Sequence, residues 1–144
     1  LGNFLWDEDR ATITDFGGSH IDGTIPSRLC ATMGYLSPER VKFEDGGFPG
    51  MIFAFGVCIA QISNNGNIPY PSDRLDEKNV LLLDEKNQSG YKRDVIEWRK
   101  KLPKNKYRNL ILEMTRIVPG KRPSIDIVIK SLIKISESHV SASS

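Results

Sequence analysis

Residues 48–62 constrain the fold most, because apolar side chains recur on nearly every face of a helix built from them. A helix that is hydrophobic all round is buried in its protein. The most apolar part, residues 51–60, is about half of the ~20 residues that a helix needs to cross a bilayer. We therefore expect a helix at the centre of the domain core and no membrane insertion by this segment.

Two later stretches have the spacing of amphipathic helices. The first places apolar residues at Tyr107, Leu110, Ile111, Met114 and Ile117, and it ends before Pro119 and Gly120. The second repeats the pattern at Ile125, Val128, Ile129, Leu132 and Ile133, with Ser124 as its N-cap. We expect both apolar stripes to face the core rather than a lipid or a cofactor. The serine-rich end of the chain predicts a disordered tail over residues 137–144.

The N-terminal residues predict a β-hairpin. Residues 4–6 and 11–14 have the composition of two short strands, and residues 7–10 have the length of a hairpin loop. The acidic residues of this loop are most simply part of a turn, because the Gly and the distant Glu of an EF-hand calcium loop are missing. The predicted fold class is mainly α, with a short β-hairpin followed by a helical bundle.

Two long segments lack a helical period. Residues 17–34 are rich in Gly, Ser and Thr and predict a long loop, which in a compact domain is usually functional or disordered. Residues 63–103 contain two charged blocks, at 76–79 and 84–87. We interpret these blocks as solvated faces around a buried patch at residues 80–83.

The charge balance and the cysteines exclude several classes of protein. The chain has 20 Lys and Arg against 18 Asp and Glu, a net charge of +2, so it lacks the electrostatic footprint of a nucleic-acid partner. Cys30 and Cys58 are far apart and no histidine stands near them, so we expect neither a zinc site nor a disulfide. Because the chain starts at Leu1 with no basic leader, we expect a processed chain or a fragment. It would be cytoplasmic, or on the cytoplasmic side of a membrane-attached parent.

Several short motifs follow one another along the chain. Asp15-Phe16-Gly17 comes directly after the second predicted strand, and Asn3 precedes the first. Residues 31–39 read Ala-Thr-Met-Gly-Tyr-Leu-Ser-Pro-Glu, residues 53–57 read Phe-Ala-Phe-Gly-Val, and residues 119–124 read Pro-Gly-Lys-Arg-Pro-Ser. A single tripeptide is a weak signal, so the order and the context of the motifs decide.

In this order the motifs resemble the C-terminal lobe of a eukaryotic protein kinase, beginning at the catalytic-loop Asn and covering residues 1–136. Thr32, ahead of Gly34 and Tyr35, is similar to the substrate loop of the serine/threonine type. The resemblance implies that the complete parent transfers the γ-phosphoryl group of ATP to Ser or Thr of a protein substrate. The catalytic-loop Asp lies upstream of Asn3 in the family. The resemblance therefore implies no catalytic residue in this chain, the upstream N-lobe of the same parent as its partner, and no activity for the chain alone.

The resemblance gives the nucleotide and metal roles to three residues. Asp15 would bind the Mg²⁺ that bridges the ATP phosphates, and Asn3 would hold a second Mg²⁺. Leu5 would lie beneath the adenine ring. Asp and Asn suit this chemistry, because phosphoryl transfer leaves charge on the phosphate oxygens and Mg²⁺ prefers hard oxygen ligands.

The same resemblance implies an activation segment with a substrate loop, and a structural ion pair. The segment includes Phe16, Gly17, Thr24, Ser27, Thr32 and Tyr35. Phe16 would be the packing switch between active and inactive states. A phosphate on one of the hydroxyls could order the loop against Arg28 or Arg40, although most of them are expected to be ordinary loop hydroxyls. Glu39 and Arg122 resemble the buried pair of the family, in which Arg meets a carboxylate bidentately.

Two positions depart from the pattern of the family. Met51 stands where an Asp normally braces the catalytic loop, and Val118 stands where an Asp precedes Pro119. These changes favour an alternative, a pseudokinase-like regulatory or protein-interaction domain that transfers nothing. A third interpretation is an unrelated helical interaction domain with accidental motifs, and it predicts no strand hairpin ahead of Asp15.

Overall fold

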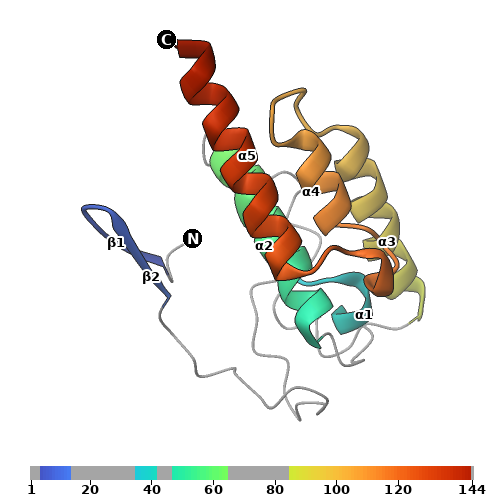
Figure 1. Ribbon diagram of the computed structural model, residues 1–144. Coiled ribbons are helices and arrows are strands. Elements are labelled where there is room, and N and C mark those ends of the chain that lie inside the picture. The colour runs from blue at the N-terminus through green and yellow to red at the C-terminus, as the bar shows by residue number, and fades with distance from the viewer. Residues whose placement is uncertain (1–3, 14–34, 42–46, 65–84, 144) are drawn as a thin grey trace.

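The computed structural model describes residues 4–13, 35–41, 47–64 and 85–143 (Figure 1). Its elements are β1 (Phe4–Asp7), β2 (Arg10–Ile13), α1 (Pro38–Val41), α2 (Gly47–Ser63), α3 (Glu85–Lys100), α4 (Arg108–Met114), the 3-10 turn η4 (Pro119–Lys121) and α5 (Ile125–Ser143). The predicted fold class is confirmed: the described chain is mainly helical and begins with a β-hairpin. The hairpin that the third interpretation excludes is present.

The hairpin is antiparallel, and its register pairs Phe4 with Ile13 and Asp7 with Arg10. Glu8, in the turn between the strands, adopts a φ of 46°. This left-handed conformation belongs to tight two-residue hairpin loops, because their twist matches the twist of the flanking strands. The turn therefore places β1 and β2 side by side over four residues each.

Helix α2 forms the centre of the core, as residues 48–62 predict, but it is not buried all round. Its inward residues are Ile52, Phe53, Gly56, Val57, Ile59 and Ala60, which are all buried. Phe48 and Met51 are each 65 % exposed, and Ile62 is 57 % exposed. The expectation of complete burial was wrong for this stripe, because the other described elements do not cover it. None of the helices within the described ranges combines the length and hydropathy of a membrane span.

Gly56 allows α2 to pack closely against α4. A Cβ atom built at Gly56 would lie 2.9 Å from Met114 Cβ and 2.9 Å from Thr115 Cγ2. Real Cβ atoms do not approach other heavy atoms so closely, so a side chain here would push the two helices apart. The glycine of the Phe-Ala-Phe-Gly motif therefore sets the spacing of the core.

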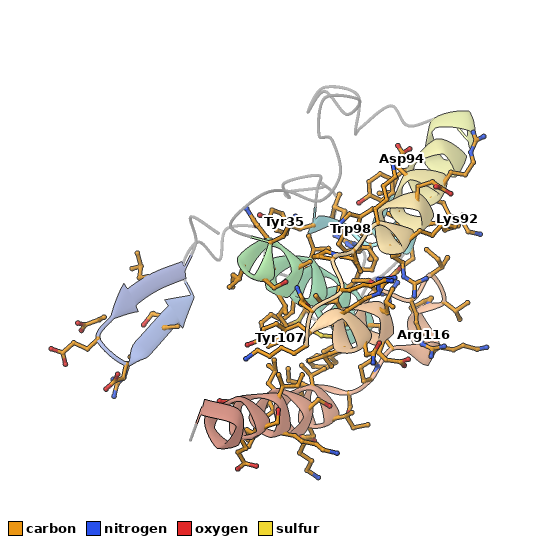
Figure 2. The ribbon with its side chains drawn as sticks, turned by 90° about the horizontal axis from the view of Figure 1, so that it is seen from above. Tyr35, Lys92, Asp94, Trp98, Tyr107 and Arg116 are labelled. Carbon is orange, nitrogen blue, oxygen red and sulfur yellow. The ribbon has the colours of Figure 1, made fainter. Side chains whose placement is uncertain are left out.

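Helix α3 corrects the interpretation of residues 63–103 as charged, solvated segments. Tyr91, Val95 and Trp98 are buried, as is Leu102 just beyond the helix. These residues recur every three or four positions, so they form one inward stripe on a helix whose other faces are polar. Figure 2 shows Trp98 on the inner side of α3 and Lys92 directed away from the bundle. The charged block at 76–79 and the expected patch at 80–83 lie outside the described residues, and residues 85–87 of the second block begin α3.

Helix α5 continues through Ser143, so the disordered tail expected over residues 137–144 is corrected for the described positions. The sequence after Pro123 contains neither Gly nor Pro, and nothing in it stops a helix once it has begun. The buried stripe of α5 is narrower than the spacing of its apolar residues predicts. Val128 is fully buried, while Ile125, Ile129 and Ile133 are between 46 % and 52 % exposed.

Candidate functional site

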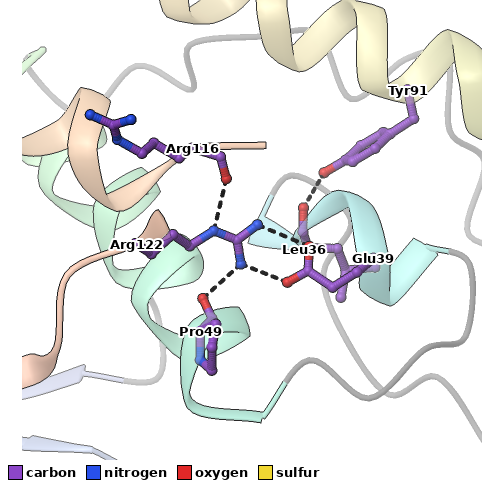
Figure 3. Close-up of polar contacts among 6 residues, drawn as sticks. All are labelled: Leu36, Glu39, Pro49, Tyr91, Arg116 and Arg122. Carbon is purple, nitrogen blue, oxygen red and sulfur yellow. Dashed lines mark hydrogen bonds and ion pairs between the residues drawn. The ribbon is translucent and has the colours of Figure 1, made fainter. Parts of the chain in front are cut away.

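Glu39 and Arg122 form a bidentate ion pair inside the protein (Figure 3). Arg122 Nη1 donates to Glu39 Oε1 at 2.6 Å, and Arg122 Nη2 donates to Glu39 Oε2 at 2.9 Å. The Arg122 side chain is 0 % exposed and the Glu39 side chain is 6 % exposed. A buried charge is tolerated only when it is paired and hydrogen-bonded, and here each charge neutralises the other.

The remaining donors of Arg122 reach the backbone of two other segments. Its Nε donates to the Arg116 carbonyl at 2.8 Å, and its Nη1 also donates to the Pro49 carbonyl at 2.8 Å. The guanidinium lies over the Phe53 ring, 5.1 Å from its centroid, which is within the range of a cation–π contact. One side chain therefore ties together α1, the first turn of α2 and the segment that precedes η4.

Two tyrosine hydroxyls anchor the residues that lead into α1. Tyr35 donates to the side-chain carbonyl of Gln61 on α2. Tyr91 on α3 donates to the Leu36 carbonyl at 2.5 Å, and both residues are buried. The short segment before Glu39 is therefore held from two sides, and its position depends on α2 and α3 as well as on the ion pair.

Burial also affects the acid–base properties of this anchor. It raises the pKa of Tyr35, and the nearby Cys58 thiolate would raise it further, while the hydrogen bond to Gln61 acts in the opposite direction. Burial likewise raises the pKa of the Cys58 thiol. Both groups are thus held in their neutral forms at physiological pH, which keeps the Tyr35 hydroxyl a hydrogen-bond donor.

An apolar groove of about 790 Å³ opens beside the ion pair. Its walls come from the first turns of α2 and from the start of α5, and they include Phe48, Met51, Phe55 and Ile125. Arg122 lies at its edge with Pro123. The exposed side chains of Phe48 and Met51 line this groove, so this part of the exposed α2 stripe forms one wall of a concave surface.

The profile of the protein kinase domain family matches residues 1–133. The match covers nearly the whole chain and includes both partners of the buried ion pair. The chain belongs to the protein kinase domain family. The expected membership of the protein kinase family is thereby confirmed, and the interpretation as an unrelated helical domain is excluded.

Known protein kinases are similar to this chain over limited parts of their length. The interferon-induced, double-stranded RNA-activated protein kinase of Mus musculus is 24 % identical over 132 residues, which are 90 % of this chain and 23 % of the relative. Protein kinase domain-containing protein ppk32 of Schizosaccharomyces pombe is 29 % identical over 104 residues, 72 % of this chain and 13 % of the relative. The G-type lectin S-receptor-like serine/threonine-protein kinase CES101 of Arabidopsis thaliana is 41 % identical over 69 residues, 42 % of this chain and 8 % of the relative. The chain thus spans less than a quarter of each of these kinases.

The described part of this kinase domain contains some of the residues that the motifs single out. Glu39 and Arg122 are brought together, Tyr35 is anchored to α2, and Leu5 lies on β1 with 57 % of its surface exposed. The other residues lie outside the described ranges: Asn3, Asp15, Phe16, Gly17, Thr24, Ser27 and Thr32. The structure therefore describes the ion pair, Tyr35 and Leu5, and not the other residues that the resemblance singles out.

The sequence motifs did not single out Tyr91, although it holds the kinase domain's Leu36 carbonyl. Its spacing to Val95 and Trp98 is the one signal that could have identified it, because it marks the inward stripe of α3. The hydrogen bond itself joins residues 55 positions apart, and no local pattern predicts such a contact.

Proposed function

We propose that the complete protein transfers the γ-phosphoryl group of ATP to Ser or Thr side chains of protein substrates, in the cytoplasm or on the cytoplasmic side of a membrane-attached parent. The buried Glu39–Arg122 pair, in a chain of the protein kinase family, carries this proposal. Positioning supplies most of the catalysis in phosphoryl transfer. The pair fixes α1, which directly follows residues 35–37, against the helical core. The substrate loop that includes Thr32 and Tyr35 would position the substrate hydroxyl.

The proposed nucleotide residues have the right chemistry for ATP and Mg²⁺. Asp15 and Asn3 offer a carboxylate and an amide oxygen, which are hard donors that fit Mg²⁺. Leu5 offers an exposed apolar side chain that would contact the adenine ring. Bound Mg²⁺ would neutralise charge on the phosphate oxygens. Phe16, Gly17, Thr24, Ser27, Thr32 and Tyr35 would form the activation segment and the substrate loop.

The proposal is tested in the complete protein by replacing the metal-binding carboxylate. Asp15→Ala is expected to lower phosphate transfer from ATP to a generic substrate such as casein by at least a hundredfold. Asp9→Ala is the matched control, because Asp9 is an exposed carboxylate of the hairpin turn, and it is expected to stay within twofold of the wild type. Equal rates for the two variants would contradict the role of Asp15.

The 144-residue chain alone is expected to transfer no phosphate. Its sequence contains no His-Arg-Asp motif, so the catalytic base is missing from these residues. The test incubates the purified chain with ATP, Mg²⁺ and casein, and follows ATP binding by calorimetry. Transfer that disappears with Asp15→Ala, or ATP binding in the micromolar range, would show that the chain holds a complete site.

A regulatory domain without transferase activity is the second candidate, and Met51 is the observation that favours it. At this position an Asp would accept backbone N–H bonds from the catalytic loop, whereas Met accepts hydrogen bonds only weakly. Met51 is 65 % exposed and lines the apolar groove, so it fills no core space among the described residues. A catalytic loop without these hydrogen bonds would be poorly ordered. The protein would then bind partners instead of transferring phosphate.

Met51→Asp in the complete protein separates the two candidates. If Met51 limits the reaction, Asp is expected to raise the transfer rate at least tenfold. Phe48→Asp adds the same charge to the same groove, at a side chain that is also 65 % exposed, and is expected to give no gain. A wild-type rate of about 1–100 s⁻¹, unchanged by Met51→Asp, would eliminate the regulatory candidate.

A further inference from the structure

A short basic strip joins α3 to α4. Residues 99–108 read Arg-Lys-Lys-Leu-Pro-Lys-Asn-Lys-Tyr-Arg, with six cationic residues and no acidic residue. The net charge of the whole chain is only +2, so this local excess is hidden in the overall balance. The nearest acidic side chains on either side, Glu97 and Glu113, are bound to Lys100 and Arg116.

The two arginines of the strip point inward and brace its backbone. Arg99 Nη2 donates to the Leu112 carbonyl at 2.9 Å, and Arg108 Nη1 donates to the Leu102 carbonyl at 2.9 Å. The Asn105 side chain accepts from the Tyr107 amide at 3.0 Å. Leu102 is buried at 4 % exposure and fixes the strip to the core. The backbone of the strip is therefore already ordered before any partner binds.

The lysines of the strip all point to solvent. Lys100, Lys101, Lys104 and Lys106 are exposed. Lys100 binds Glu97, and Lys106 lies over the Tyr107 ring at 5.1 Å from its centroid. Burial and the charge of Arg116 both lower the pKa of Arg99, which agrees with an excess of positive charge in this part of the surface. The backbone that carries these exposed lysines is already fixed, so binding has to order only their side chains.

We propose that the basic strip is a docking surface for an acidic peptide segment of a partner protein. Charge complementarity favours this partner, since four exposed lysines lie within seven consecutive residues. A membrane is a poorer partner, because Leu102 is buried and Pro103 is half-buried, so the strip offers no large exposed aliphatic side chain to insert into lipid. Single-stranded RNA is also a poorer partner, because stacking needs an exposed aromatic ring and Tyr107 is half-buried under Lys106. The proposal concerns binding alone and does not depend on phosphate transfer.

The test titrates the 144-residue chain into a fluorescein-labelled hexaglutamate peptide at low salt and follows fluorescence anisotropy. The charge-reversal variant is Lys101→Glu with Lys104→Glu. The matched control is Lys130→Glu with Lys134→Glu, which replaces two exposed lysines of α5 and gives the same change in net charge. Lys101→Gln with Lys104→Gln is a milder variant, and circular dichroism verifies that all variants are folded.

We expect the charge reversal in the strip to weaken peptide binding at least fivefold and the Gln variant at least twofold, with the control within twofold of the wild type. Binding should also weaken as salt is raised, because the lysines are exposed to screening. Equal weakening by the strip variant and the α5 control would overturn the proposal, since only net charge would then matter. So would strip-dependent binding of phosphatidylserine vesicles or oligouridine in the absence of peptide binding.

Discussion

Arg122 contacts one carboxylate and two backbone carbonyls, so its removal leaves several groups without a partner. Arg122→Ala would bury the Glu39 carboxylate without its cation. Breaking a buried pair in this way costs about 3–5 kcal/mol. We expect the free energy of unfolding of the 144-residue chain to fall by that amount, measured by urea denaturation and circular dichroism.

Arg116→Ala is the control for this substitution. Arg116 pairs with Glu113 on the surface, where the two side chains are 41 % and 51 % exposed, so water replaces the lost partner. Its carbonyl, which accepts from Arg122, is retained in the variant. If Arg122→Ala lowered the free energy of unfolding by no more than Arg116→Ala does, the Glu39–Arg122 pair would add nothing to stability.

The partner of Glu39 could not be found from local sequence patterns. Arg122 lies 83 residues away, and periodicity describes only neighbours within a few turns. The resemblance of two separate motifs to one family pointed to the pair. The carbonyls of Pro49 and Arg116 had no sequence signal at all, because every residue carries a carbonyl and only the fold selects which ones Arg122 reaches.

Helices α2 and α4 can approach closely because position 56 has no side chain. Gly56→Ala would place its Cβ 2.9 Å from two atoms of α4 and its C-cap. Overpacking of this kind typically costs about 1–3 kcal/mol, and we expect a loss of stability in that range by urea denaturation.

Gly90→Ala provides the opposite case within α3. A Cβ at Gly90 meets no atom within 4 Å among the described residues beyond its own stretch of helix, and alanine is a better helix former than glycine by about 0.5–1 kcal/mol. We therefore expect Gly90→Ala to leave stability unchanged or raise it. If both alanine variants had the same effect, contact between α2 and α4 would not be the reason that position 56 is glycine.

The elements differ in how well their sequences predict them. Helices α2, α4 and α5 follow from dense apolar patterns at residues 48–62, 107–117 and 125–133. Helix α3 was missed because its composition is strongly polar, and its stripe of Tyr91, Val95 and Trp98 is narrow. Exposure of the outer α2 stripe could not be predicted either, because burial depends on which elements lie against a helix, and a single helix does not specify them.

The whole described bundle is joined by contacts between distant segments. Tyr35 donates a hydrogen bond to a residue 26 positions away, and Tyr91 donates one to a residue 55 positions away. The ion pair joins two residues that are 83 positions apart. Residues around α1 therefore depend on α2, α3 and the segment before α5. A substitution in α2, in α3 or in the segment before α5 should therefore shift the position of residues 35–39.

The sequence separation of the ion pair also has a kinetic meaning. Closing 83 residues of chain is entropically unfavourable, so contacts within helices and between neighbouring helices should form first and the pair late. A late contact is absent from the folding transition state. Arg122→Ala should then leave the folding rate nearly unchanged and raise the unfolding rate by about a hundredfold or more. Stopped-flow folding in urea would measure both rates, and slower folding in the variant would place the pair early instead. The pair would thus set the lifetime of the folded chain rather than the rate at which the chain folds.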